Sequence, residues 1–474
     1  MRTILSSLTA LLAVLALPAN AQDGKALLLN DVQILHLEEE GARLVPGMSI
    51  LIEGDTIVSI LPAEKAHKGG SARVIEGSGR IVMPGLFDMH VHVWDQQSLG
   101  AYLATGVTTI RNASGMPFHL RLIHEIERGT VIGPRLITAG PILNSPGPNQ
   151  QINHQMVITA DEAQEAVRKQ HESGYRRLKV YSNLTREAYE AVLQEARRLG
   201  MTVMGHTPEG VREPGMPYKR PFNIGFQEIL DDGFITIEHV ESIVWHGLRD
   251  EYNEAAGRKL AHKIAAAGVP VDPTLLAFYN LLRVAETRGE YLRRPGTELL
   301  NPLLVAQSQA EYERWANEEV ERNRYAFEFY KRMVKMLSEE GVLLVAGSDA
   351  GIFTNIPGIS LIEELELLEE AGLDRVEVLR AATINSAIAL GEQDQVGRVA
   401  KGYRADLLLL ERDPTQSLVA LRSVSAVVAG GRWLDRTALD DQLAAASQHN
   451  ITRTQRNLVE ALTEQGVDPE ILGL

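Results

Sequence analysis

Residues 81–92 read IVMPGLFDMHVH, an apolar run that ends in two histidines one residue apart. On an extended strand, side chains two positions apart leave the same face, so His90 and His92 would project side by side from the end of a buried strand. A divalent metal ion can bind both imidazoles. Such a pair can also merely decorate a strand end, and the choice between these interpretations depends on the other ligands that the chain offers.

From about residue 84 to residue 390, short runs rich in β-branched residues alternate with longer segments of helical period. This alternation is typical of parallel strands joined by helical crossovers. Helices are expected at residues 118–128, 160–172 and 186–199. Strands are expected at residues 81–90, 107–110, 135–138, 178–180, 201–204, 234–237, 269–272 and 342–345. Eight strands is the number in a closed α/β barrel.

The two flanks of this region read as strands and turns instead. Neither flank is large enough to form a good core, so we expect the two to pair as one small β-domain. The predicted fold class is therefore α/β, a (β/α)8 TIM barrel with a small β-sandwich domain built from both flanks. The expected parts are a signal peptide at 1–21, the composite β-domain at 22–83 and 393–435, the barrel at 84–392 and a C-terminal helical tail at 436–474.

The first 21 residues have the pattern of a secretory signal peptide. Arg2 supplies a positive start, residues 8–17 form an apolar core, and residues 19–21 form a small-residue cleavage site. The apolar core is too short for a membrane span, and no later stretch has the ~20 apolar residues that a span requires. We expect cleavage after Ala21 and a periplasmic or secreted protein without a membrane anchor.

The composition excludes several kinds of site and partner. The chain has no cysteine, which excludes thiolate zinc ligands, structural disulfides and a lipoprotein anchor. A formal net charge of −15 argues against nucleic acid as a partner. A small-molecule substrate is expected instead, and the sequence leaves the formation of a homo-oligomer open.

Further candidate ligands follow the expected strands, on the barrel face where active sites are built. They are Lys179, His206, His239 and Asp349. One such residue alone is more often structural, but candidates at the ends of five strands are hard to explain by chance. Four imidazoles and a carboxylate suit two zinc-like ions, one held by His90 and His92. The other ion would be held by His206 and His239.

Lys179 is the exception in this set, because an ammonium group cannot bind a metal ion. Buried beside cations, the ammonium should lose its proton readily. The free amine could then add carbon dioxide, and the N6-carboxylated Lys179 would bridge the two ions as an anion. The alternative is an ion pair between Lys179 and a carboxylate of the barrel.

Together these motifs resemble the amidohydrolase superfamily, in particular its exported imidazolonepropionase-like and prolidase-like (Xaa-dipeptidase-like) branch. The resemblance covers nearly all of the chain after residue 21. It implies a barrel that holds one or two divalent metal ions, with the lysine of the fourth strand carboxylated when two are present. True imidazolonepropionases lack that lysine bridge, so Lys179 departs from them. The matching segments are residues 84–92, 178–181, 205–206, 237–239, 347–351 and 397–407.

The resemblance and the ligand set imply a hydrolase that cleaves an amide C–N bond with a metal-bound hydroxide. The metal ions would lower the pKa of the water towards ~7. Asp349 would accept the proton of the water and pass it to the leaving nitrogen, and it can also bind metal. A dipeptide or an N-acyl amino acid is the expected substrate. The alternatives are hydrolysis of a cyclic amide, a lactone or a carbamate, deamination, and a non-enzymatic relative that kept the fold.

Residues that select the substrate are harder to recognise. An arginine or a tyrosine at a strand end could hold a substrate carboxylate, and a histidine in a loop after a strand could touch the substrate. Each such residue has packing as its alternative role. The candidates are Arg111, Tyr181, His154 and Tyr279. The polar helical insertion at residues 280–335 is either a lid or a covering pair of helices.

Overall fold

The computed structural model describes residues 26–67, 71–148, 150–151, 153–210 and 222–469. The expected signal peptide lies outside these residues. No helix in the described part of the chain combines the length and the apolar composition of a membrane span.

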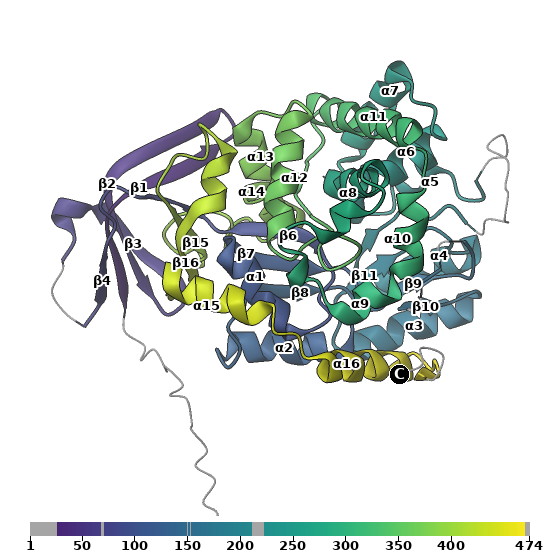
Figure 1. The fold of residues 1–474 in the computed structure, drawn as a ribbon, viewed down its shortest axis with the longest axis horizontal. Helices are drawn as coiled ribbons and strands as arrows, with labels where there is room; N and C mark the ends of the chain where they lie inside the picture. The colour runs from purple at the N-terminus through teal and green to yellow at the C-terminus, as the bar shows by residue number, and fades with distance from the viewer. Residues whose placement is uncertain (1–25, 68–70, 149, 152, 211–221, 470–474) are drawn as a thin grey trace, which may run out of the picture.

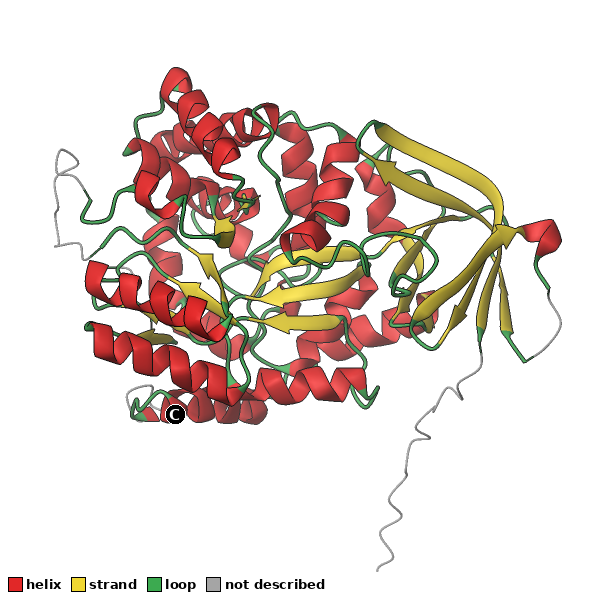
Figure 2. Cartoon of the chain, turned by 180° about the vertical axis from the view of Figure 1, so that it is seen from behind, coloured by secondary structure: helices red, strands yellow, loops and turns green. Residues whose placement is uncertain are grey.

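Two parallel sheets form the centre of the molecule, and helices surround them (Figure 2). The first sheet holds, in order, β6 (Leu86–Val91), β7 (Val107–Asn112) and β8 (Arg135–Thr138). The second holds β10 (His154–Met156), β9 (Ile142–Asn144), β11 (Arg177–Val180), β12 (Thr202–Gly205), β13 (Phe234–Glu238) and β14 (Val271–Asp272). All their pairs are parallel, as expected for strands joined by crossovers.

A small number of backbone contacts connect the two parallel sheets. Next to β8 and β11, the Gly140 N–H donates to the Arg177 carbonyl at 2.9 Å. On the other side, β14 forms a parallel bridge with Leu344, and β6 forms one with Ala350. Residues 342–345 were expected to form the eighth strand, and isolated bridges hold this part of the chain in place of a continuous ladder.

Helices follow most of these strands. The three helices expected from the sequence are present as α2 (Pro117–Glu127), α3 (Ala160–Ser173) and α4 (Arg186–Leu199). Local capping interactions explain where these helices begin and end, as α4 illustrates. The Thr185 side chain accepts from the Ala188 N–H at the start of α4, and Gly200 ends that helix at a φ of 67°.

The other helices of this region pack around the strands in the same way (Figure 1). They are α1 (Leu99–Ala104), α5 (Phe226–Ile229), α6 (Val240–Leu248), α7 (Glu254–Ala267), α8 (Leu275–Glu286), α9 (Pro302–Gln307), α10 (Gln309–Ala316), α11 (Val320–Glu339), α12 (Ile359–Glu370), α13 (Arg375–Ala381) and α14 (Ile384–Ala389).

Strands from both flanks of the chain form one further sheet, on the left in Figure 1. Its order is β17 (Arg432–Asp435), β16 (Val424–Ala429), β15 (Leu407–Leu410), β5 (Ile81–Pro84), β1 (Leu27–Glu38), β2 (Gly41–Glu53) and β3 (Thr56–Pro62), with β4 (Arg73–Glu76) beside β1. The two flanks meet where β15 pairs antiparallel with β5, Leu408 lying opposite Met83. Leu407 and Leu409 face the core of this sheet, whereas Leu408 and Leu410 face the main core.

The C-terminal segment is helical, with α15 (Arg436–Ala446) and α16 (Ile451–Glu464). These helices cover α1 and α2 along the lower edge in Figure 1. Arg453 of α16 is fixed there by a bidentate pair with the buried Asp95, at 2.5 Å for both contacts. The segment is thus attached to the body of the protein.

Candidate metal centre

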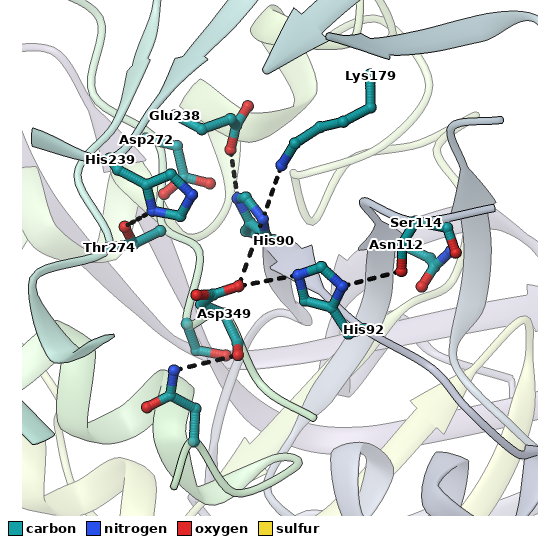
Figure 3. A network of polar contacts seen from close by, with 12 residues as sticks. His90, His92, Asn112, Ser114, Lys179, Glu238, His239, Asp272, Thr274 and Asp349 are labelled. Atoms are coloured by element: carbon teal, nitrogen blue, oxygen red, sulfur yellow. Dashed lines mark hydrogen bonds and ion pairs between the residues drawn. The ribbon is translucent and has the colours of Figure 1, made fainter. Parts of the chain in front are cut away.

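Six residues selected from the sequence line one cavity at the carboxyl ends of the parallel strands. They are His90, His92, Lys179, His206, His239 and Asp349. Figure 3 shows five of them converging. The Nε2 atom of His90 lies 3.0 Å from Lys179 Nζ and 3.5 Å from Asp349 Oδ1, and His92 Nε2 lies 3.0 Å from the same oxygen. The rings of His206 and His239 are 4.3 Å apart between centroids.

The backbone at these strand ends has unusual conformations. His239 and Asp349 have positive φ angles of 68° and 55°, which cost non-glycine residues on the order of 1–3 kcal/mol each. Close packing also requires glycine at two positions near the site residues. A Cβ atom on Gly205 would lie 2.2 Å from the Val180 carbonyl oxygen, and one on Gly347 would lie 2.2 Å from Asp272 Oδ2.

Three of the four imidazoles are held through Nδ1, which leaves Nε2 for the centre of the site. His90 Nδ1 contacts Glu238 Oε2 at 2.7 Å. Hydroxyl groups hold the other two rings, Ser114 at 2.9 Å from His92 and Thr274 at 2.6 Å from His239. His206 differs, because its Nδ1 atom is buried and has no hydrogen-bond partner among the described residues.

These donors fit a divalent metal ion. One potential ligand atom from each of His90, His92 and Asp349 lies within 4.8 Å of the others, and all three residues are buried. Imidazole nitrogen and carboxylate oxygen are ligands that zinc and related divalent ions accept. The Nδ1 atom of His206 is a further potential metal ligand, since it is buried and has no hydrogen-bond partner in the described structure.

Burial sets the protonation states that metal binding needs. It lowers the pKa of His90 and His206 far below the usual value, and that of His239 to about 4, so these rings are neutral at neutral pH. Burial also lowers the pKa of Lys179 to about 8, although Glu238 and Asp349 oppose this shift. Burial alone would raise the pKa of Asp349, but its contacts with His90 and His92 outweigh this effect and lower it.

A second layer of charged residues lies beneath the site, and sequence reasoning missed it. Potential ligand atoms of His90, Glu238 and Asp272 lie within 4.8 Å of one another. Glu238 is not free to bind an ion, because it already accepts from Arg111 at 2.9 Å and from Thr236. The signal for this layer was in the sequence: Thr236 and Glu238 alternate along β13, so both must face the interior of the expected barrel.

Of the four predicted substrate residues, Tyr181 alone lines the cavity in the described part of the structure. Arg111 is fully buried and does not line the cavity in the described structure, contrary to the expected role in holding a carboxylate. Tyr181 does line the cavity, and the centroid of its ring lies 3.9 Å from that of His206. His154 contacts Tyr181, at 4.5 Å between ring centroids, and is not among the described residues of the cavity wall. Tyr279 packs against Phe327 and is not among the described residues of the cavity wall.

The cavity has a volume of about 470 Å³. Aromatic side chains form much of its wall beyond the metal residues, including Trp245 of α6, Phe278 of α8 and Trp315 of α10. The expected insertion at residues 280–335 therefore contributes to the wall through Trp315. The acidic residues Glu209, Glu241 and Asp250 also lie there.

Residues 235–434 match the model of the amidohydrolase family. This match confirms the resemblance to the amidohydrolase superfamily that the sequence motifs predict. An ochratoxinase from Aspergillus niger is 20% identical over 81% of this chain and 83% of its own. An imidazolonepropionase from Rubrobacter xylanophilus is 41% identical, but the match spans only 15% of this chain and 18% of the relative.

Solved structures share the fold. The bottromycin amidohydrolase superposes with a TM-score of 0.69 at 24% identity, over 94% of this chain and 92% of its own. An Xaa-Pro dipeptidase with bound methionine gives 0.66 at 20% identity, over 87% and 100%. A putative prolidase from Bifidobacterium longum gives 0.65 at 22% identity, over 89% and 99%. At these identities, the similarity concerns the fold alone.

Proposed function

We propose that this protein is a metal-dependent amidohydrolase that cleaves an amide C–N bond in a dipeptide or an N-acyl amino acid with the help of two zinc ions. The observation that carries the proposal is the convergence of four imidazoles, Lys179 and Asp349 on one cavity. The neutral state of three of these imidazoles supports it, since a protonated ring cannot bind metal.

The proposed scaffold for this site is a single closed (β/α)8 barrel. The backbone contacts from β8 to β11, and from β14 through Leu344 and Ala350 to β6, support closure. All the site residues then lie at the carboxyl ends of strands, where barrel enzymes place their chemistry.

His90, His92 and Asp349 would hold one ion, and His206 and His239 the other. Lys179 would join both ions as a carbamate. A pKa of about 8 supports this role, because a useful fraction of the side chain is then free amine at neutral pH. The amine nitrogen bonds to the carbon of carbon dioxide, one proton leaves to solvent, and the product is an anion.

Asp349 would move the proton. Its lowered pKa keeps the carboxylate ionised, and its Oδ1 atom faces the centre of the site between His90 and His92. It would take a proton from the attacking water and deliver it to the leaving nitrogen, first as general base and then as general acid. The bound ions would lower the pKa of that water and polarise the scissile carbonyl.

The substrate class rests on the cavity and on the relatives. A volume of about 470 Å³ lies in the range of small-molecule sites and suits a dipeptide or an acylated amino acid. Two structures of the same fold are described as a dipeptidase and a prolidase. The acidic groups of the cavity wall favour substrates with cationic side chains, so the dipeptides to be tested should include such compounds.

The test combines metal analysis with a hydrolysis panel on the full-length protein. The expected result is two equivalents of divalent metal and turnover of dipeptides or N-acyl amino acids, which a chelator abolishes. The panel also contains lactones, cyclic ureides, carbamates and amidines. Activity confined to those compounds would overturn the amide assignment, and purified protein that neither contains nor binds metal would overturn the whole proposal.

A further inference from the structure

We infer that Glu238 is a positioning residue of the metal centre, which fixes the tautomer and the orientation of His90 and is itself held by Arg111 and Thr236. This inference rests on the proposed metal-dependent function. It concerns residues that do not touch the metal ions or the substrate.

The contacts of Glu238 carry the inference. The residue is fully buried, and its Oε2 atom lies 2.7 Å from His90 Nδ1. The other oxygen, Oε1, accepts from Arg111 at 2.9 Å and from the Thr236 hydroxyl. A carboxylate held by a guanidinium is an acceptor only, so the proton between Glu238 and His90 belongs to Nδ1 of the ring.

Lys179 supports the same tautomer from the opposite side of the ring. Its Nζ atom lies 3.0 Å from His90 Nε2, where it can donate to the lone pair of that nitrogen. The lone pair of Nε2 is thus directed at the centre of the site, where the proposed metal would lie.

His90 is the only one of the three Nδ1-held imidazoles in the described structure whose partner is a carboxylate. Ser114 and Thr274 hold His92 and His239 with hydroxyl groups, which can either donate or accept and therefore do not dictate a tautomer. A carboxylate partner also makes the ring a more basic ligand. His90 should accordingly be the imidazole with the most firmly determined orientation.

Arg111 connects this carboxylate to the backbone that carries His90. Its guanidinium donates to the Met89 carbonyl at 2.6 Å and to Thr236 at 2.7 Å, in addition to Glu238. Three strands, β6, β7 and β13, are joined by this one buried side chain. The arrangement explains why Arg111 lies inside the protein and not on the cavity wall.

The first test is Glu238→Gln in the full-length protein. The glutamine has nearly the same shape, but its amide must direct a donor at either His90 Nδ1 or Arg111. We expect the affinity of the metal-free protein for Zn²⁺ to fall by about 10- to 100-fold, measured by competition with a chromophoric chelator. The ring nitrogens of His90 in the metal-free protein, observed by ¹H–¹⁵N correlation, should also lose the pure Nδ1–H pattern.

Glu364→Gln is the matched control. Glu364 is also a fully buried glutamate, but it accepts from the backbone N–H groups of Leu275 and Leu276 and lies outside both clusters of potential ligands in the described structure. This variant should retain the affinity for Zn²⁺ and the tautomer of His90. A general effect of removing a buried carboxylate would instead appear equally in both variants and would overturn the inference.

Further outcomes separate this inference from the proposed function. If the native protein binds no metal, the proposed function fails, but the His90 tautomer in Glu238→Gln still tests the inference. If the native protein binds metal while Glu238→Gln binds it equally well with an unchanged tautomer, the inference fails alone. Should Glu238→Gln not fold, Thr236→Val removes one donor to Glu238, and an unchanged Zn²⁺ affinity in that variant would overturn the inference.

Discussion

Replacing Asp349 by asparagine removes the proposed proton acceptor with the smallest change in shape. Asparagine tolerates the positive φ of 55° at this position, so the variant adds little backbone strain. Its side-chain oxygen can still accept from His92 Nε2, which lies 3.0 Å from Oδ1 in the native protein. The fold and most of the metal binding should therefore survive, and the effect should be confined to proton transfer.

The expected loss follows from that role. General acid–base catalysis contributes about 10²- to 10⁴-fold, so kcat should fall by this factor, equivalent to about 3–5 kcal/mol in the activation free energy. The assay measures kcat on the best substrate of the hydrolysis panel, together with the metal content of the same preparation. Asp349 has a lowered pKa, so the loss should be similar across the neutral pH range.

Asp250→Asn provides the comparison, because Asp250 also lines the cavity and has the same φ of 55°. It lies outside the cluster of potential ligands, so its replacement should alter KM more than kcat. Native turnover by a metal-loaded Asp349→Asn protein would refute the reasoning. An equal loss of kcat in both variants would also refute it, since the effect would then come from the charge of the cavity.

Four further outcomes are expected. Lys179→Met should bind one equivalent of divalent metal in place of two, because the bridging carbamate cannot form; two tightly bound ions, counted by elemental analysis, would contradict this. Recovery of activity when zinc and bicarbonate are added to the metal-free protein should become faster as the pH rises from 6 towards 8, since the fraction of Lys179 present as free amine rises steeply as the pH approaches the pKa of about 8; a rate independent of pH would argue against carbamate formation. Removal of the metals should lower the melting temperature, and zinc at 1,000 times its Kd should restore about 4 kcal/mol of stability; calorimetry that shows no shift would count against a site formed only in the folded state. Export should yield a chain that begins at Gln22, which intact-mass measurement of the secreted protein checks.

Local periodicity predicted most of the central strands and the first helices, because apolar spacing and capping residues act over a few positions. Residues 342–345 differ, since this part of the chain contacts its neighbours β14 and β6 through isolated bridges between segments that are far apart in the sequence. The ligands were recognisable because strand ends share one face. The side chains that meet beneath these ligands could not be recognised from the sequence, because the contact between Arg111 and Glu238 joins β7 to β13 across a long stretch of sequence.

The pairing of β5 with β15 has a consequence for the order in which the protein can fold. Met83 emerges early in synthesis, whereas its partner Leu408 follows only after the entire central region. Until then β5 lacks one neighbour, and the apolar face of β1 and β2 lacks part of its cover. Contacts between distant parts of a chain form slowly, and unpaired strand edges favour aggregation in the meantime. A chain shortened before residue 407 should therefore accumulate as an insoluble product, even with every proposed ligand of the metal centre present.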